Sequence, residues 1–317
     1  MSMAAMKSSS AMSRLLFSKP TPPALEWEKE KPKSLLLKHP LYQTTNSNIS
    51  LQFKEKILCL EIMGVDSGKA LAQNPSLRSA SLQSIHSVLT FLQSNGLHLN
   101  DLGRILGMCP ALLTADIKSD LVPVFQFLSR DLRVPTHHFR RVINKCPRLL
   151  VSSAGDQLKP ALFYLQRLGF KDIRSLAYRD PILLVSSVER TLIPKLRYLV
   201  SLGFSEADAV GMVLRCPGLF TFSIENNFKP KFDYFVKEIS SGGLEELKEF
   251  PQYFAFSLEK RIRPRHALVL ESGVGFPLPL MLKTTDEEFT ELLNNNNKKK
   301  KKLKTTCLDG DDDDLCV

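Results

Sequence analysis

Apolar residues recur along this chain at helical spacing, in stretches separated by proline and glycine. In the stretch 192–200 the apolar side chains fall on one face of a helix. These residues are Leu192, Leu196, Leu199 and Val200. The pattern predicts a helix that begins near Pro194, because a proline at a helix start lacks only an N–H that has no partner there. Leu196 is expected to be buried in the middle of the packed face.

A shorter second helix is predicted after the first one. Gly203 is expected to end the first helix in the left-handed conformation. The second helix then runs from about Ser205, a suitable N-cap, to Arg215. Pro217 stops it, because the residue before a proline is pushed out of the helical region. The predicted unit is a helix, a turn, a short helix, a proline and an apolar connector.

This unit repeats every 34 to 37 residues along the chain. The first proline of each unit is Pro75, Pro110, Pro147, Pro181, Pro217 or Pro251. A second proline follows 13 residues later at Pro123, Pro160, Pro194, Pro230 and Pro264, and only the first unit has Val88 instead. No unit can bury its own apolar face alone, so the units must stack. The sequence predicts an all-α, superhelical α-solenoid of about six helical repeats, with residues 51–74 as a partial N-terminal capping unit.

The repeated motif is specific enough to indicate a family. It reads Cys-Pro-x-Leu-Leu at 146–150, Cys-Pro-x-Leu-Phe at 216–220 and Ile-Pro-x-Leu-x-Tyr-Leu at 193–199. This arrangement resembles the mitochondrial transcription termination factor (mTERF) family over roughly residues 57–293. The resemblance implies a solenoid of mTERF-type repeats that binds nucleic acid in an organelle and regulates transcription, transcript processing or translation. It leaves open whether DNA or RNA is bound.

The two ends of the chain differ in composition from the repeats. Residues 1–25 contain no Asp or Glu and six serines, which is typical of an organellar transit peptide and favours the chloroplast over the mitochondrion. An ordinary N-terminal segment without a targeting role is the alternative. We assign residues 1–50 to a transit peptide and linker, 51–293 to the repeat domain, and 294–317 to a disordered low-complexity tail with runs of lysine and aspartate.

The sequence contains no constellation that indicates an enzyme. Cys109, Cys146 and Cys216 share one repeat position, which fits a small buried side chain better than a metal ligand. The loop 64–70 resembles a phosphate-binding loop but is one residue short, and Ala70 replaces the hydroxyl that would bind magnesium. A turn between two helices is expected there instead. No cofactor and no metal site are expected, and no apolar run is long enough to predict a membrane span.

Positive charge is the main indication of a binding partner. The net charge of +10 favours a polyanion such as nucleic acid. The repeat register places basic residues in three rows, which can follow a phosphate backbone. Cations that stabilise helix C-termini or form a solvated face are the alternative. The rows are Lys145, Arg179 and Arg215, two residues before the first proline; Lys159, Lys229 and Arg263, directly before the second; and Lys195, Lys231 and Arg265, directly after it.

Two functions follow from these observations. We expect a nucleic-acid-binding regulator of plastid gene expression that acts on double-stranded DNA or RNA of the organelle, in transcription termination or transcript processing. The alternative is an α-solenoid that serves as a protein–protein interaction scaffold in the organelle. Binding that weakens steeply with salt distinguishes the first function from the second.

Overall fold

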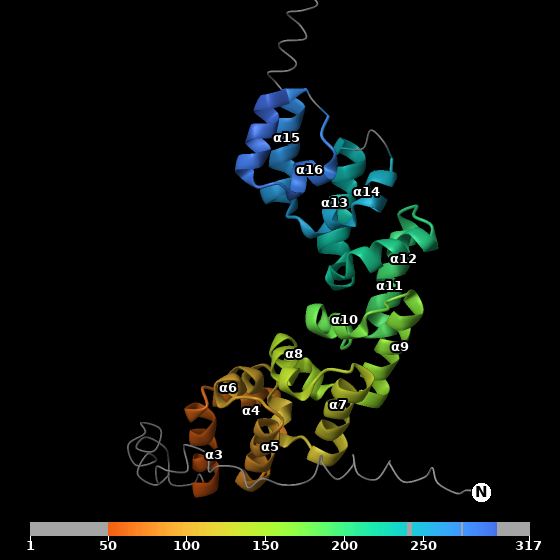
Figure 1. Ribbon diagram of the computed structural model, residues 1–317. Coiled ribbons are helices and arrows are strands. Elements are labelled where there is room, and N and C mark those ends of the chain that lie inside the picture. The colour runs from red at the N-terminus through yellow and green to blue at the C-terminus, as the bar shows by residue number, and fades with distance from the viewer. Residues whose placement is uncertain (1–49, 240–242, 274, 297–317) are drawn as a thin grey trace, which may run out of the picture. The chain divides into compact units, whose positions relative to one another are not determined.

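The computed structural model describes residues 50–239, 243–273 and 275–296, and every regular element in these residues is a helix (Figure 1). This confirms the predicted all-α fold. The predicted transit peptide, the linker that follows it except for Ser50, and the lysine and aspartate runs lie outside the described residues. The chain divides into two compact units between Leu158 and Lys159. The stretch 51–293, which we predicted to be one repeat domain, therefore contains parts of both units.

The first unit begins with the partial repeat, whose helix α3 packs beside α5. Its elements in order are α3 (Leu51–Ile62), α4 (Ser67–Gln73), η2 (Pro75–Arg78), α5 (Leu82–Ser94), α6 (Leu99–Met108), η3 (Pro110–Thr114), η4 (Ile117–Leu121), α7 (Val122–Gln126), η5 (Phe127–Asp131), η6 (Thr136–His138), α8 (Phe139–Lys145), η7 (Pro147–Val151) and η8 (Ala154–Leu158).

The second unit follows the same plan, with α12 packed against both α11 and α14. Its elements are α9 (Lys159–Leu168), α10 (Ile173–Arg179), η9 (Pro181–Leu183), η10 (Val188–Leu192), α11 (Ile193–Ser201), α12 (Glu206–Arg215), η11 (Pro217–Thr221), η12 (Ile224–Phe228), α13 (Lys229–Tyr234), η13 (Phe235–Ile239), α14 (Glu245–Glu249), η14 (Pro251–Ala255), η15 (Leu258–Ile262), α15 (Arg263–Ser272), α16 (Leu278–Lys283) and a last helix over 286–296.

The short helix of each repeat forms as the sequence predicts. In α12 the hydroxyl of Ser205 accepts a hydrogen bond from the backbone N–H of Asp208, and the helix ends before Cys216, which leaves the helical region with φ −135°. Pro217 then opens a 3₁₀ turn, η11, which forms the predicted apolar connector. Gly203 ends α11 with φ +104°, which favours glycine because it has no Cβ.

Each long helix belongs to a helical segment that is capped before the position of the second proline. Six residues after every first proline, a side chain accepts a hydrogen bond from the backbone N–H three residues further on, which is the geometry of a helix N-cap. The α-helix α11 begins at Ile193, as predicted near Pro194, but a π-helical turn precedes it, so the second proline lies inside a longer helical segment. The capping residues are Ser81, Asp116, Ser153, Ser187, Ser223 and Ser257.

A widened turn accommodates this interior proline. In a regular α-helix the ring of Pro194 would clash with the carbonyl of Arg190, four residues earlier. The preceding turn is instead a π-helix, in which the N–H of Leu192 bonds to the carbonyl of Ser187, five residues back, at 3.1 Å. The first repeat supports this reason, because Val88 replaces the proline there and α5 is an uninterrupted α-helix.

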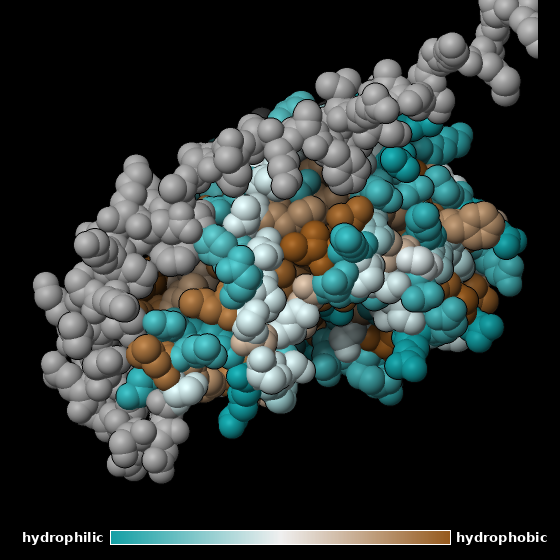
Figure 2. Space-filling view, turned by 90° about the horizontal axis from the view of Figure 1, so that it is seen from below, coloured by the Kyte–Doolittle hydropathy of each residue, from teal (hydrophilic) through white to brown (hydrophobic). Residues whose placement is uncertain are grey.

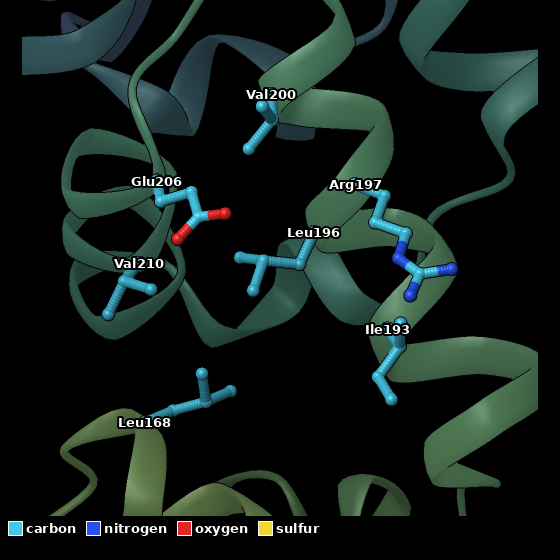
Figure 3. A pocket seen from close by; sticks show the side chains of 7 residues that line it. All are labelled: Leu168, Ile193, Leu196, Arg197, Val200, Glu206 and Val210. Carbon is cyan, nitrogen blue, oxygen red and sulfur yellow. The ribbon is translucent and has the colours of Figure 1, made fainter.

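The helix face predicted in α11 is only partly buried. Leu192 and Leu199 are fully buried, but Leu196 and Val200 are half-exposed and line an open, mostly apolar pocket (Figure 3). The pocket lies between α11, the end of α9 and α12. The prediction that Leu196 is in the middle of the packed face is therefore wrong, because neighbouring repeats do not close over it.

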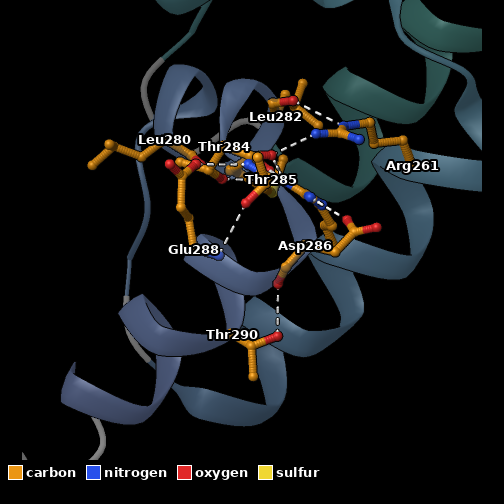
Figure 4. Close-up of polar contacts among 10 residues, drawn as sticks. Arg261, Leu280, Leu282, Thr284, Thr285, Asp286, Glu288 and Thr290 are labelled. Atoms are coloured by element: carbon orange, nitrogen blue, oxygen red, sulfur yellow. Dashed lines mark hydrogen bonds and ion pairs between the residues drawn. The ribbon is translucent and has the colours of Figure 1, made fainter.

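Side-chain caps begin the helices near the two ends of the described chain. Gly64 has φ +75°, and Asp66 caps α4 by accepting a hydrogen bond from the N–H of Lys69, which confirms that the loop after α3 is a turn between helices. At the other end, Thr285 and Glu288 each accept a hydrogen bond from the other's backbone N–H, which is a capping box (Figure 4).

Candidate nucleic-acid interface

The nine basic residues predicted at the interface separate into an outward set and an inward set. Six are exposed, namely Lys145, Lys159, Arg179, Arg215, Lys229 and Arg263. The row directly after the second proline turns inward: Lys231 and Arg265 are 6% and 4% exposed, and Lys195 is half-buried. Repeat register alone does not distinguish these two orientations.

The inward row caps the 3₁₀ turn of the next repeat. The ammonium group of Lys195 donates to the carbonyl of Phe220 at 2.5 Å, and that of Lys231 donates to the carbonyl of Phe254 at 2.6 Å. Both carbonyls lie at the end of a 3₁₀ turn, where backbone acceptors lack partners within the turn. These lysines tie each repeat to its successor, so their ammonium groups are already engaged within the fold.

Arg265 has the same role at the last repeat. Its guanidinium donates to the carbonyls of Met281 at 2.7 Å and Thr284 at 2.9 Å, and it pairs with Asp286. Arg261 donates to the carbonyl of Leu282 at 2.9 Å (Figure 4). We therefore assign Lys195, Lys231 and Arg265 to repeat stacking instead of phosphate binding.

Lys56 is a further residue of this kind that the sequence did not reveal. It lies in the partial capping unit, is 5% exposed, and donates to the carbonyls of Leu77, Arg78 and Ala80 at 2.9, 2.8 and 2.6 Å. Burial lowers the pKa of Lys56, and it lowers the pKa of Lys231 to about 8. The inward row was defined by its position relative to the second proline. The partial unit has no such proline, so Lys56 could not be assigned to this row.

The outward row on the short helices also takes part in stacking. Arg215 of α12 donates to the carbonyl of Lys248 in α14. Arg104 of α6, which is outside this row, similarly donates to the carbonyl of Asn144 in α8 at 2.9 Å. An ion pair of 3.1 Å between Lys248 and Asp208 joins the same two helices as Arg215 does. Hydrogen bonding by Ser205 and then by Lys248 lowers the pKa of Asp208. This row is therefore partly engaged within the fold.

The outward row on the long helices is differently placed. Lys229 pairs with Glu225 at 3.5 Å and Arg263 pairs with Glu259 at 3.1 Å, one helical turn away in each case. All four side chains are at least half exposed, and such ion pairs contribute little to stability. A phosphate can replace the glutamate as the partner of either cation at little cost to the fold.

This row belongs to a larger stripe in the second unit, which is exposed except for the half-buried Ile193. Residues directly before, three after and seven after the second proline are one helical turn apart and lie on one side of each long helix. We call this stripe the long-helix face. It consists of Lys159, Phe163 and Arg167; Ile193, Arg197 and Ser201; Lys229, Asp233 and Lys237; and Arg263, Ala267 and Glu271.

Two tyrosines lie beside a cation of the next long helix. Burial raises the pKa of Tyr164, and the nearby charge of Arg197 on the next long helix opposes that rise. The guanidinium of Arg263 lies 4.8 Å from the ring centroid of Tyr234 on the preceding long helix. The stripes of α9 and α11, and those of α13 and α15, are therefore neighbours. The long-helix face carries six cations and two anions, Asp233 and Glu271. Three of the cations, Arg167, Arg197 and Lys237, were not among the predicted interface residues, because they do not stand next to a proline of the repeat.

The remaining chemistry of the described residues is structural. Cys109 and Cys146 are buried, Cys216 is half-buried, and burial raises the pKa of all three thiols. Within residues 50–239, 243–273 and 275–296, no cluster of three His, Cys, Asp or Glu side chains could hold a metal ion, and no helix is long and apolar enough to cross a membrane. Figure 2 shows hydrophilic side chains interspersed with smaller apolar areas on one face.

The repeats match a known family over most of the chain. A sequence profile described as mTERF matches residues 23–201 and 171–290. The chain belongs to the mTERF family. The match begins inside the segment that we assigned to a transit peptide and linker, and it ends close to the predicted end of the repeat domain at 293.

Relatives of this mTERF chain are named as chloroplast proteins. It is 41% identical over 78 residues to transcription termination factor MTERF2 of Arabidopsis thaliana, covering 25% of this chain and 12% of the relative. It is 40% identical over 87 residues to MTERF5 of the same plant, covering 27% and 17%. A longer match to the plant's MTERF8 is 26% identical over 227 residues, covering 71% and 44%. These names support the predicted chloroplast localisation, and the matches span less than half of each relative.

Proposed function

We propose that this mTERF chain is a nucleic-acid-binding regulator of chloroplast gene expression that acts in transcription termination or transcript processing. The relatives MTERF2, MTERF5 and MTERF8 bear the name transcription termination factor. The observation that carries the proposal is the long-helix face, where cations recur on four consecutive long helices of the second unit and remain exposed.

Each cation of this face can neutralise one phosphate of a nucleic acid. Lys159, Lys229 and Arg263 occupy equivalent repeat positions, so a backbone that runs across the long helices meets one after another. Arg167 and Lys237 stand two helical turns from Lys159 and Lys229 and widen the positive surface. Exposed cations keep their hydration until a phosphate replaces it, which gives affinity with little sequence preference.

A salt titration of the full chain tests this function. Labelled duplex DNA and single-stranded RNA of equal length are titrated at several salt concentrations. We expect binding to at least one polymer, with an affinity that falls linearly on a log–log plot against salt. Absence of binding at low salt, or affinity that does not change with salt, would contradict the proposal and favour the protein-scaffold alternative.

A further inference from the structure

One residue of the long-helix face is apolar and yet exposed. Phe163 on α9 is 61% exposed, although a phenyl ring in water forgoes the stabilisation that burial would give. Lys159 precedes it by one helical turn and Arg167 follows it by one turn, and both are exposed. The three side chains form a cation–aromatic–cation stripe along a single helix.

The geometry of this stripe is compact. At a rise of about 1.5 Å per residue, each cation is placed about 6 Å along the helix axis from the phenyl ring. The guanidinium of Arg167 lies 5.9 Å from the ring centroid, which is within the range of a cation–π contact. This contact favours a ring position beside Arg167 without covering the ring, which is still largely exposed.

We propose that Phe163 is a stacking platform for an unpaired nucleobase, with Lys159 and Arg167 binding the phosphates on either side of that base. An exposed aromatic ring stacks on any base, and flanking cations hold the backbone of a single strand. The bases of a duplex already stack on one another and do not offer a face to the ring. The inference rests on the proposed function and deepens it, since it assigns single-stranded nucleic acid to this part of the face.

The surroundings of Phe163 favour this ligand over a protein surface. Protein interfaces usually gather several apolar side chains into one patch. Among the exposed large apolar side chains of the described residues, Phe163 alone lies on α9. Its neighbours on the stripe are cations, and Arg197 of the next long helix adds a third positive charge near Tyr164.

Three probes separate stacking from phosphate binding in the full chain. The first is a labelled oligo(U) strand about 15 nucleotides long, which matches the site size of many single-strand-binding proteins. The second is an abasic strand of the same length, which keeps the phosphates and lacks the bases. The third is a duplex of the same length. Wild type is compared with Phe163→Ala and with Phe163→Tyr, which keeps an aromatic ring, and circular dichroism checks that each variant is folded.

We expect Phe163→Ala to weaken binding of oligo(U) by roughly 5- to 150-fold, because one base loses its stacking partner. Affinity for the abasic strand and for the duplex should stay within about twofold of wild type, and Phe163→Tyr should bind oligo(U) like wild type. Equal binding of oligo(U) by wild type and Phe163→Ala would overturn the stacking site and assign the ring to a protein contact. Equal loss on all three probes would overturn it too.

The same data separate this inference from the proposed function. If wild type binds these probes in a salt-dependent way and Phe163→Ala has no effect, the stacking site fails while nucleic-acid binding stands. If wild type binds none of the probes even at low salt, both fail.

Discussion

The ammonium group of Lys231 donates a hydrogen bond of 2.6 Å to the main-chain carbonyl of Phe254, in the 3₁₀ turn of the following repeat. Tyr253 returns a bond in the other direction, from its hydroxyl to the carbonyl of Lys231 at 3.0 Å. A residue that repeat register places beside the exposed cations therefore belongs to the contact between repeats.

Replacing Lys231 by methionine should destabilise the protein. The variant Lys231→Met keeps the apolar stem but leaves the buried carbonyl of Phe254 without a donor, at a cost of about 1–3 kcal/mol in the free energy of unfolding. Urea denaturation measures it. The control Lys229→Met, two residues away and exposed, should change the same quantity by less than about 0.5 kcal/mol. Equal effects of the two variants would show that the buried hydrogen bond has no special role.

The contribution of Lys231 should grow as the pH rises. Burial lowers its pKa in the folded protein to about 8, from an ordinary value of 10.5. Between these values the unfolded chain binds more protons than the folded one, so the stability contributed by this group rises with pH. The neutral amine still donates to Phe254 and no longer carries a buried charge.

Urea denaturation of wild type and Lys231→Met from pH 7.5 to 9.5 measures this effect. The difference in unfolding free energy between them should widen as the pH rises through about 8. Taking this difference removes the titration of other groups from the comparison. A gap that narrows over the same range would contradict the assignment.

Two leucines of α11 should respond differently to truncation. Leu199 is fully buried, so Leu199→Ala should lower the free energy of unfolding by about 2–5 kcal/mol. Leu196 lines the open pocket and is already in contact with solvent, so Leu196→Ala should cost about 1 kcal/mol or less. Chemical denaturation of both variants checks the order, and a larger loss for Leu196→Ala would mean that the pocket is closed in solution.

The N-caps of the long helices should contribute measurably to stability. The hydroxyl of Ser187 accepts a hydrogen bond from the N–H of Arg190 at 3.1 Å, so Ser187→Ala should cost about 1 kcal/mol. Ser201 is exposed near the end of α11 and provides the control. Ser201→Ala should be neutral within about 0.5 kcal/mol. If thermal unfolding shows no difference between the two, the long helix does not begin at Ser187.

Much of the fold could be predicted because the residues that end its helices act locally. Pro217 and Gly203 act through backbone geometry that depends on the residue itself, so the short helix and the turn were predicted correctly. The predicted α-helix near Pro194 is present as α11, but the π turn before it was not predicted, because a proline usually marks the start of a helix. The capping residues, five serines and Asp116, stand six residues after the first prolines. This constant spacing is the sequence signal that could have revealed the turn before each second proline.

The interface was harder to predict because the repeat register does not determine whether the charged end of a long side chain is exposed or buried. Lys229 and Lys231 lie two residues apart on one helix, and one is exposed while the other is buried. The stem of lysine is apolar and can be buried when a backbone acceptor lies within hydrogen-bonding distance of its ammonium group. That acceptor, the carbonyl of Phe254, is 23 residues away in sequence and becomes visible only when the repeats are stacked.

The measurement that most directly tests the long-helix face is the salt dependence of nucleic-acid binding by a triple variant of the full chain. Lys159→Ala, Lys229→Ala and Arg263→Ala combined should reduce the log–log slope by about 2–3, since each lost phosphate contact removes about 0.7–0.9. The control combines Lys145→Ala, Arg174→Ala and Arg179→Ala, which removes the same charge from the short helices. We expect the control to keep the wild-type slope. A reduced slope in the control with an unchanged slope in the long-helix variant would contradict the account.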